Sequence, residues 1–185
     1  MRGFEDNSYD MVFTSPPFKD EDVEGDYWDF YDSFFKEAYR VTNKALIIIH
    51  SATKLEYLYQ HYPPKRIMIW GKGVVKYSWR FNPILVYQKN EYKVNKYIWS
   101  DVFGVAPIYG SEKAHKYQDP EILYQTILSM FKDCKTVLDP FMGSGTTGRA
   151  CLSLQKDFTG IDIIRENVQL SQQLLQTRQE QKTLT

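Results

Sequence analysis

Residues 137–148 read VLDPFMGSGTTG, an apolar strand-like start that continues into a glycine-rich turn and a helix-like stretch. Gly143, Gly145 and Gly148 match the pattern GxGxxG, in which glycines let the backbone between a strand and a helix approach a ligand closely. Asp162 ends the next strand-like stretch, 19 residues after Gly143. A carboxylate at that place holds ribose hydroxyls in dinucleotide-binding folds. The stretch therefore predicts an α/β domain with a site for a nucleoside-containing ligand.

Predicted strands and helices alternate along the rest of the chain. The expected strands are 9–14, 44–51, 65–70, 77–89, 136–141 and 158–163, and the expected helices are 31–41, 54–61, 120–131, the stretch after the turn up to 156, and 165–182. Asp119 is expected to cap the helix that Pro120 begins. This alternation predicts a mainly parallel sheet with helices on both faces. The 185 residues suit a single domain, residues 1–185, in which the irregular segment 90–118 forms a long functional loop.

The composition excludes several classes of protein. The two cysteines form no CxxC or Cys/His cluster, so neither a disulfide framework nor a metal site is expected. The longest aliphatic run, residues 45–49, is too short to span a bilayer, and no signal peptide opens the chain. We expect a protein without membrane contact, in the cytoplasm or associated with the nucleoid.

The net charge of zero hides a basic middle segment. Residues 41–116 carry 12 Lys and Arg against 4 Asp and Glu, interleaved with aromatic residues. Cations suit phosphates and rings suit exposed bases, so this segment favours nucleic-acid binding; the alternative is a solvated face of the sheet. The candidate nucleic-acid contacts are Lys72, Lys76, Trp79, Arg80, Lys93 and Lys96.

Asp139 and Pro140, just before the glycine turn, indicate which class of ligand the turn would bind. The glycine pattern alone also fits an NAD enzyme, or a turn that only packs a helix on a strand. A carboxylate at the strand tip would repel a pyrophosphate, whereas it suits a cationic ligand with an amino group. S-adenosylmethionine is such a ligand.

A second strand tip is marked by FTSPPF, residues 13–18. Two prolines lack backbone N–H groups and fix their own φ angles, so they end the strand that begins at Tyr9. Taken alone, the stretch is a strand terminator. The strand therefore stops abruptly, with polar groups exposed at its tip.

The two stretches together resemble the amino-group DNA methyltransferases of the β type, in which the catalytic proline motif precedes the cofactor motif. The resemblance extends over nearly the whole chain. It implies a Rossmann-like methyltransferase fold, S-adenosyl-L-methionine as cofactor, and DNA as substrate with the target base flipped out of the duplex.

The resemblance also assigns roles to residues. Ser15, Pro16, Pro17 and Phe18 would be catalytic: the Ser15 hydroxyl and the Pro16 carbonyl accept the two amino hydrogens, and Phe18 stacks on the base. The cofactor contacts would be Thr14, His115, Asp139, Phe141, Gly143, Ser144, Gly145, Thr146 and Asp162. Lys116 stands where the family usually has a proline after the histidine. The Ser-Pro-Pro form is associated with methylation of cytosine at its 4-amino group; adenine at its 6-amino group, an RNA substrate, or a catalytically weak binding module that needs a partner chain are the alternatives.

This chain differs from the family at its start. Relatives usually have a strand before the catalytic motif that helps to hold the cofactor adenine, and MRGFEDNSYD contains no such strand. We therefore expect a sheet one strand short, with the Asp162 strand near an exposed edge. A second copy, a complementary chain or residues outside this sequence would complete the pocket. Target recognition is left to residues 90–118.

Overall fold

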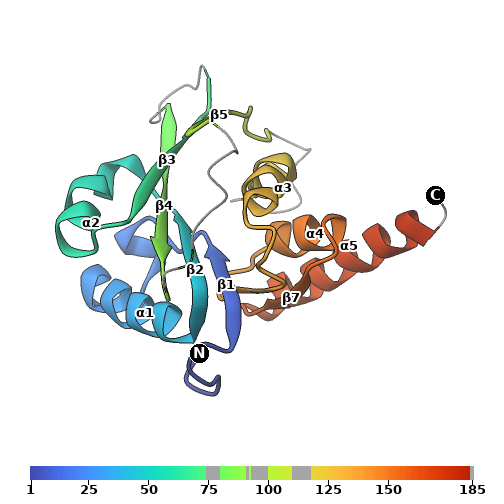
Figure 1. Ribbon diagram of the computed structural model, residues 1–185, viewed down its shortest axis with the longest axis horizontal. Helices are drawn as coiled ribbons and strands as arrows, with labels where there is room; N and C mark the ends of the chain where they lie inside the picture. The colour runs from blue at the N-terminus through green and yellow to red at the C-terminus, as the bar shows by residue number, and fades with distance from the viewer. Residues whose placement is uncertain (74–79, 91, 93–99, 110–117, 184–185) are drawn as a thin grey trace.

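The computed structural model describes residues 1–73, 80–90, 92, 100–109 and 118–183, and these form a seven-stranded sheet between two layers of helices (Figure 1). The strand order is β5-β3-β4-β2-β1-β6-β7. The strands are β1 (Tyr9–Thr14), β2 (Thr42–Ile49), β3 (Arg66–Gly71), β4 (Phe81–Gln88), β5 (Val102–Gly104), β6 (Thr136–Asp139) and β7 (Asp157–Gly160).

Helices cover both faces of the sheet (Figure 1). On one side lie α1 (Tyr27–Val41) and α2 (Leu55–His61), and on the other lie α3 (Glu121–Met130), α4 (Thr146–Ser153) and α5 (Arg165–Thr183). Two short 3-10 turns, η1 (Asp20–Asp22) and η2 (Ala52–Lys54), follow β1 and β2. The predicted α/β architecture with helices on both faces is confirmed.

The central strands are buried on both faces because their side chains alternate between two apolar clusters. In β1, Met11 and Phe13 join the cluster under α3 and α4, while Val12 joins the cluster under α1 and α2. In β2, Ile47 and Ile48 divide in the same way. This two-sided burial explains why these strands read as continuous apolar runs in the sequence.

Strand direction brings the sequence motifs to one edge of the sheet. Neighbours β2, β1, β6 and β7 run parallel, and β4 runs antiparallel to both β2 and β3. The carboxyl ends of β1, β2, β3 and β6 and the start of β4 therefore meet at one edge, which we call the carboxyl edge. Strand β7 is last in the order, which confirms the prediction that the strand before Asp162 lies at a border of the sheet. Completion of that border by a second chain stays a prediction.

Three local predictions are corrected. Helix α1 begins at Tyr27 rather than Tyr31, because the Asp26 carboxylate accepts hydrogen bonds from the backbone N–H groups of Trp28 and Asp29. Asp119 does not cap α3: Pro120 is the N-cap residue and makes no side-chain cap, while the Asp119 carboxylate accepts from the Tyr124 hydroxyl.

The third correction concerns the segment 90–118, which contains a strand. Strand β5 pairs parallel with β3, and Phe103 is buried between its two exposed neighbours, Val102 and Gly104. None of the helices in the described part of the chain is both long enough and apolar enough to cross a bilayer.

Candidate functional site

The two sequence motifs meet at the carboxyl edge, although 125 positions separate them. Strand β1 pairs with β6, so the residues at their tips are neighbours. The Thr14 hydroxyl donates a 2.7 Å hydrogen bond to Asp139 Oδ1. Thr14 immediately precedes Ser15, and this contact therefore ties the Ser-Pro-Pro turn to the glycine turn.

Asp139 is the buried centre of this junction. Its side chain is only 3% exposed, and its carboxylate accepts hydrogen bonds from the hydroxyls of Thr14 and Thr147 and from the backbone N–H of Phe141. Burial raises the pKa of Asp139 to about 6 against the opposing effect of these donors. The carboxylate thus orders the two strand tips and supplies a negative field at the carboxyl edge.

The glycine turn lies between β6 and α4, as its sequence predicts. Gly143 and Gly145 have φ angles of 48° and 76°, in the left-handed region that favours glycine, and Gly145 is the N-cap residue of α4. A Cβ at Gly148 would lie 2.7 Å from the Phe158 ring, so the third glycine lets α4 pack closely on β7. Within the turn, Gly143 is half-buried, and Ser144, Gly145 and Thr146 are buried.

Arg149 braces this turn from inside α4. Its Nη1 donates to the Ser144 carbonyl at 2.6 Å, and its Nη2 donates to Thr146 Oγ1 at 3.2 Å. Glu121 of α3 lies 3.3 Å from Arg149 Nε and also pairs with Arg178 of α5. Three helices therefore fix two of the residues assigned to the cofactor, Ser144 and Thr146.

Replacing Gly145 with alanine is expected to weaken binding of S-adenosylmethionine by about tenfold or more and to lower the melting temperature. The φ angle of 76° disfavours a side chain, and the new Cβ would meet Ser171 Cβ at 3.0 Å, at a cost of about 2 kcal/mol. Calorimetry and thermal unfolding measure the two effects. Gly3→Ala is the matched control, because a Cβ there meets nothing within 4 Å. Unchanged affinity in Gly145→Ala would contradict this role of the turn.

Asp162 lies beside the first glycine of the turn. Its Oδ2 accepts from the Gly143 N–H at 3.0 Å, and its Oδ1 accepts from the Ile164 N–H and from Asn167 Nδ2. The side chain is half-buried, two residues beyond the end of β7. Next to it, Ile163 is 98% exposed. A carboxylate and an exposed apolar side chain thus stand side by side at the border of the sheet.

Ser15 is half-buried at the tip of β1, and its hydroxyl is near enough to Tyr124 to oppose the rise in the pKa of that buried tyrosine. Tyr124 belongs to α3, stacks on Phe13 with ring centroids 4.7 Å apart, and donates its own proton to Asp119 Oδ2 at 2.9 Å. Because the Tyr124 proton is donated to Asp119, the tyrosine oxygen is left as an acceptor on the side of Ser15.

Some of the other assigned residues lie in the described part of the chain, and some lie outside it. Phe141 packs edge-on against Phe34 of α1, with ring centroids 5.1 Å apart. Lys72 and Arg80 follow β3 and precede β4, so both lie at the carboxyl edge, and the Lys72 N–H donates to the Arg80 carbonyl at 2.8 Å. Lys76, Trp79, Lys93, Lys96 and His115 lie outside the described residues.

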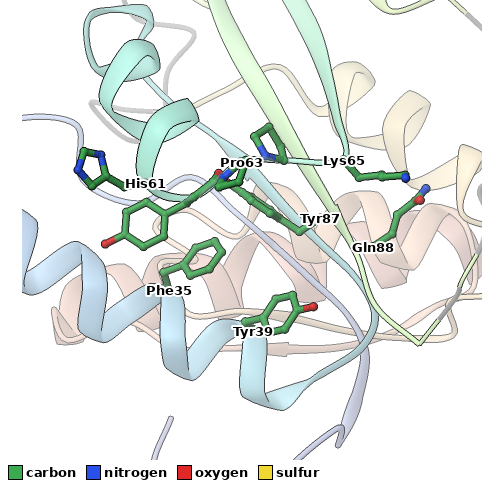
Figure 2. A pocket seen from close by; sticks show the side chains of 9 residues that line it. Phe35, Tyr39, His61, Pro63, Lys65, Tyr87 and Gln88 are labelled. Carbon is green, nitrogen blue, oxygen red and sulfur yellow. The ribbon is translucent and has the colours of Figure 1, made fainter.

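A cavity of about 460 Å³ lies away from this site (Figure 2). It is lined by side chains of α1, of the segment after α2 and of the end of β4, including Phe35, Tyr39, Pro63 and Tyr87. Gln88 at its rim pairs with Ala45 near the start of β2, which is the opposite edge of the sheet. This cavity is therefore separate from the junction of the two motifs.

Four residues that contact the two turns were not predicted from the sequence: Tyr124, Arg149, Tyr27, whose hydroxyl donates to the Pro17 carbonyl, and His50, whose ring lies 5.1 Å from that of Phe18. His50 directly follows β2, so its place after a buried parallel strand is a signal that was available. Arg149 directly follows the GxGxxG pattern. Tyr27 and Tyr124 gave no local signal, because aromatic residues on a helix are usually core.

Comparison with known proteins agrees with this geometry. A family model described as DNA methylase, N6_N4_Mtase, matches residues 9–173. The type II methyltransferase M.HpaI of Haemophilus parainfluenzae is 26% identical over 221 residues, covering 95% of this chain and 70% of that protein. M.HinfI of Haemophilus influenzae is 34% identical over 113 residues, covering 58% of this chain and only 32% of that protein.

Two solved structures have the same fold. The cytosine-N4-specific PvuII DNA methyltransferase has a TM-score of 0.76 at 17% identity, covering 92% of this chain and 80% of that one. M1.HpyAVI in complex with S-adenosylmethionine has a TM-score of 0.68 at 22% identity, covering 94% and 91%. The family match, the fold and the two joined motifs agree, and this chain belongs to the N6/N4 family of S-adenosylmethionine-dependent DNA methyltransferases.

Proposed function

We propose that this protein transfers a methyl group from S-adenosyl-L-methionine to the 4-amino group of cytosine in DNA. The observation that carries the proposal is the junction of the Ser15 turn with Asp139 through the 2.7 Å hydrogen bond of Thr14. It puts the acceptors for an amino group next to a cofactor turn. The PvuII enzyme, described as cytosine-N4-specific, shares the fold, and the serine at position 15 supports the same base.

The residues at the carboxyl edge suit S-adenosylmethionine. The left-handed glycines, braced by Arg149, open the backbone of the turn, and the buried Asp139 charge favours a cation there. Asp162 would hold the ribose, and the exposed Ile163 beside it would pack on the adenine. Bound S-adenosylmethionine supplies an electrophilic methyl group at a sulfonium centre.

The protein's own task is to make the amino nitrogen nucleophilic. The lone pair of an exocyclic amino group is delocalised into the ring, and two acceptors on its hydrogens favour the tetrahedral geometry that frees it. Ser15 Oγ would supply one acceptor, with its own proton turned toward the Tyr124 oxygen, which is left as an acceptor because Tyr124 donates to Asp119. The Pro16 carbonyl supplies the other, because the Pro17 carbonyl is occupied by the Tyr27 hydroxyl at 2.9 Å.

We expect Tyr124→Phe to lower kcat by about tenfold while the Kd for S-adenosylmethionine stays within about twofold. The substitution keeps the ring stacked on Phe13 but removes the oxygen that orients the Ser15 hydroxyl. Ser15 would then lose the partner that holds its proton away from the substrate, at a cost of about 1.4 kcal/mol in the transition state. Single-turnover methylation and calorimetry measure the two constants. A variant with the kcat of the wild type would contradict the role of Tyr124.

The DNA surface would include the carboxyl edge. Lys72 and Arg80 border it and would contact phosphates, and Phe18 would stack on a base that has left the duplex. We propose residues 90–118 as the reduced target-recognition region of a single domain. We also propose that a second copy or a complementary chain completes the β7 border.

The function is tested by incubating the protein with labelled cofactor and DNA and digesting the product to nucleosides. Label in 4-methyldeoxycytidine supports the proposal. Label in 6-methyldeoxyadenosine instead would move the substrate to adenine, which is the other base of the family name. Absence of label in DNA, with no heat of cofactor binding, would leave only a nucleic-acid-binding module and overturn the proposal.

A further inference from the structure

A second hydrogen-bonded chain reaches the Ser-Pro-Pro turn from the side of α1. His50 at the end of β2 is completely buried, and its Nδ1 accepts a hydrogen bond from the Ser51 N–H at 2.8 Å. A neutral imidazole with an acceptor at Nδ1 carries its proton on Nε2. Nε2 lies 2.8 Å from the Tyr27 hydroxyl oxygen, so His50 donates to Tyr27. Burial and the nearby Lys54 ammonium lower the pKa of His50 to about 3 and keep it neutral.

Tyr27 connects His50 to the backbone of the Ser-Pro-Pro turn. Its oxygen accepts from His50, and its proton is donated to the Pro17 carbonyl at 2.9 Å. The two hydrogen bonds therefore run in the same direction, from His50 to Tyr27 and from Tyr27 to the Pro17 carbonyl. Tyr27 is itself only 4% exposed, so water does not replace the bond readily.

Fixing the Pro17 carbonyl also fixes the carbonyl before it. The ring of Pro17 fixes its φ angle, so ψ of Pro17 is the one soft torsion between the Pro16 and Pro17 carbonyls. A hydrogen bond that holds the Pro17 carbonyl limits this torsion. A constraint on the Pro17 carbonyl is transmitted to the Pro16 carbonyl, which is the proposed acceptor of an amino hydrogen.

The same histidine contacts the base-stacking residue. The rings of Phe18 and His50 have centroids 5.1 Å apart with a tilt of 35°. On the outer side, Lys54 Nζ lies 3.8 Å from the centroid of the Tyr27 ring and 2.6 Å from Asp20 Oδ1 of η1. The turn is therefore held between β2, α1 and η1. His50 contacts it in two ways: through Tyr27 it is linked to the Pro17 carbonyl, and its own ring packs against Phe18.

We propose that His50 and Tyr27 are positioning residues for methyl transfer, in which the directed chain from His50 Nε2 through the Tyr27 hydroxyl to the Pro17 carbonyl fixes the Pro16 acceptor relative to Phe18. The inference rests on the proposed function for its catalytic readout. Neither residue would touch the reacting atoms.

Tyr27→Phe tests the chain with a matched control, Tyr87→Phe. The Tyr87 hydroxyl donates to the Tyr62 carbonyl at 2.9 Å, and Tyr87 is 5% exposed in the same apolar cluster, but it does not contact the turn. Tyr27→Phe loses the bonds to Pro17 and His50, whereas Tyr87→Phe loses one bond to a backbone carbonyl, so the melting temperature is expected to fall in both and further in Tyr27→Phe. Activity is compared at a temperature at which both variants are folded. We expect kcat to fall about tenfold or more in Tyr27→Phe and to stay within about twofold in Tyr87→Phe, with the Kd for S-adenosylmethionine unchanged in both. Equal kcat in the two variants would overturn the proposal.

A second comparison uses His50. Glutamine keeps an N–H donor that can reach Tyr27, whereas leucine does not, so His50→Gln is expected to retain several-fold more kcat than His50→Leu. Nitrogen-15 NMR of the wild-type imidazole, assigned through His50→Gln, is expected to show the Nε2–H tautomer. An Nδ1–H tautomer would overturn the directed chain without reference to activity. Absence of methylation by the wild type would instead contradict the proposed function, and the NMR result would still decide the direction of the chain.

Discussion

Replacing Ser15 with alanine is expected to lower kcat by about 100-fold or more while the Kd for S-adenosylmethionine stays within about twofold. The substitution removes one of two acceptors for the amino hydrogens, and loss of one such aligned group typically costs about 3 kcal/mol in the transition state. Cofactor affinity is spared because the contact between β1 and β6 is made by Thr14 with Asp139, not by Ser15. Single-turnover transfer of labelled methyl and calorimetry give the two numbers.

Ser129→Ala is the matched control for this prediction. Its hydroxyl donates to the Thr126 carbonyl within α3. Ser129 lies next to the last residue of that helix, and therefore away from the carboxyl edge. It loses a serine hydroxyl without touching the site, so kcat is expected to remain close to the wild-type value. Ser15→Ala with wild-type kcat, or with cofactor affinity reduced as much as kcat, would refute the assigned role.

The sequence predicted those parts of the fold that local chemistry determines. Strand β1 ends at Thr14 as expected, because two prolines cannot continue a strand. The glycine turn lies between β6 and α4 as expected, and Gly143 and Gly145 adopt a left-handed backbone there, which no other residue adopts so readily. Helix α5 begins at Arg165 as expected. In each case, the residues that decide the structure are adjacent in the chain.

The failures involve partners that are distant or competing. Asp119 stands where a capping residue is expected, yet its carboxylate accepts from Tyr124 because that hydroxyl is buried and needs a partner. Strand β5 has only three residues, and its pairing with β3 rather than any alternation in its own sequence defines it. Tertiary contacts outweigh local preference at both positions.

The place of the motif residues near strand tips could be predicted from the sequence, and their contacts with one another could not. Ser15, Asp139 and Asp162 follow from their places at strand tips. The hydrogen bond from Tyr124 to Asp119, and the one between His50 and Tyr27, depend on which atoms face each other across different elements. A pattern of residue types in one dimension does not contain that information.

Replacing Asp139 is expected to have the second large effect, and the two substitutions at this position separate charge from shape. Asp139→Ala leaves the hydroxyls of Thr14 and Thr147 and the N–H of Phe141 without their acceptor, so both strand tips lose their alignment. We expect cofactor affinity to fall by about 100-fold and methyl transfer to fall with it. Asp157→Ala, which removes an exposed carboxylate at the opposite edge of the sheet, is expected to change neither.

Asp139→Asn keeps the shape and removes the charge, which makes its stability depend on pH in a defined direction. Because burial raises the pKa of Asp139 from 3.8 to about 6, the charged carboxylate lowers the free energy of unfolding by about 3 kcal/mol at neutral pH. That cost disappears as pH falls through 6 toward 4. Asp139→Asn is therefore expected to be at least as stable as the wild type at pH 7.5, with the wild type gaining relative stability toward pH 4, while its affinity for the cationic cofactor falls about tenfold. Denaturant unfolding across this pH range measures the difference; a gap that widens toward acid in favour of Asp139→Asn would show that the carboxylate is stabilised by its three donors rather than penalised by burial.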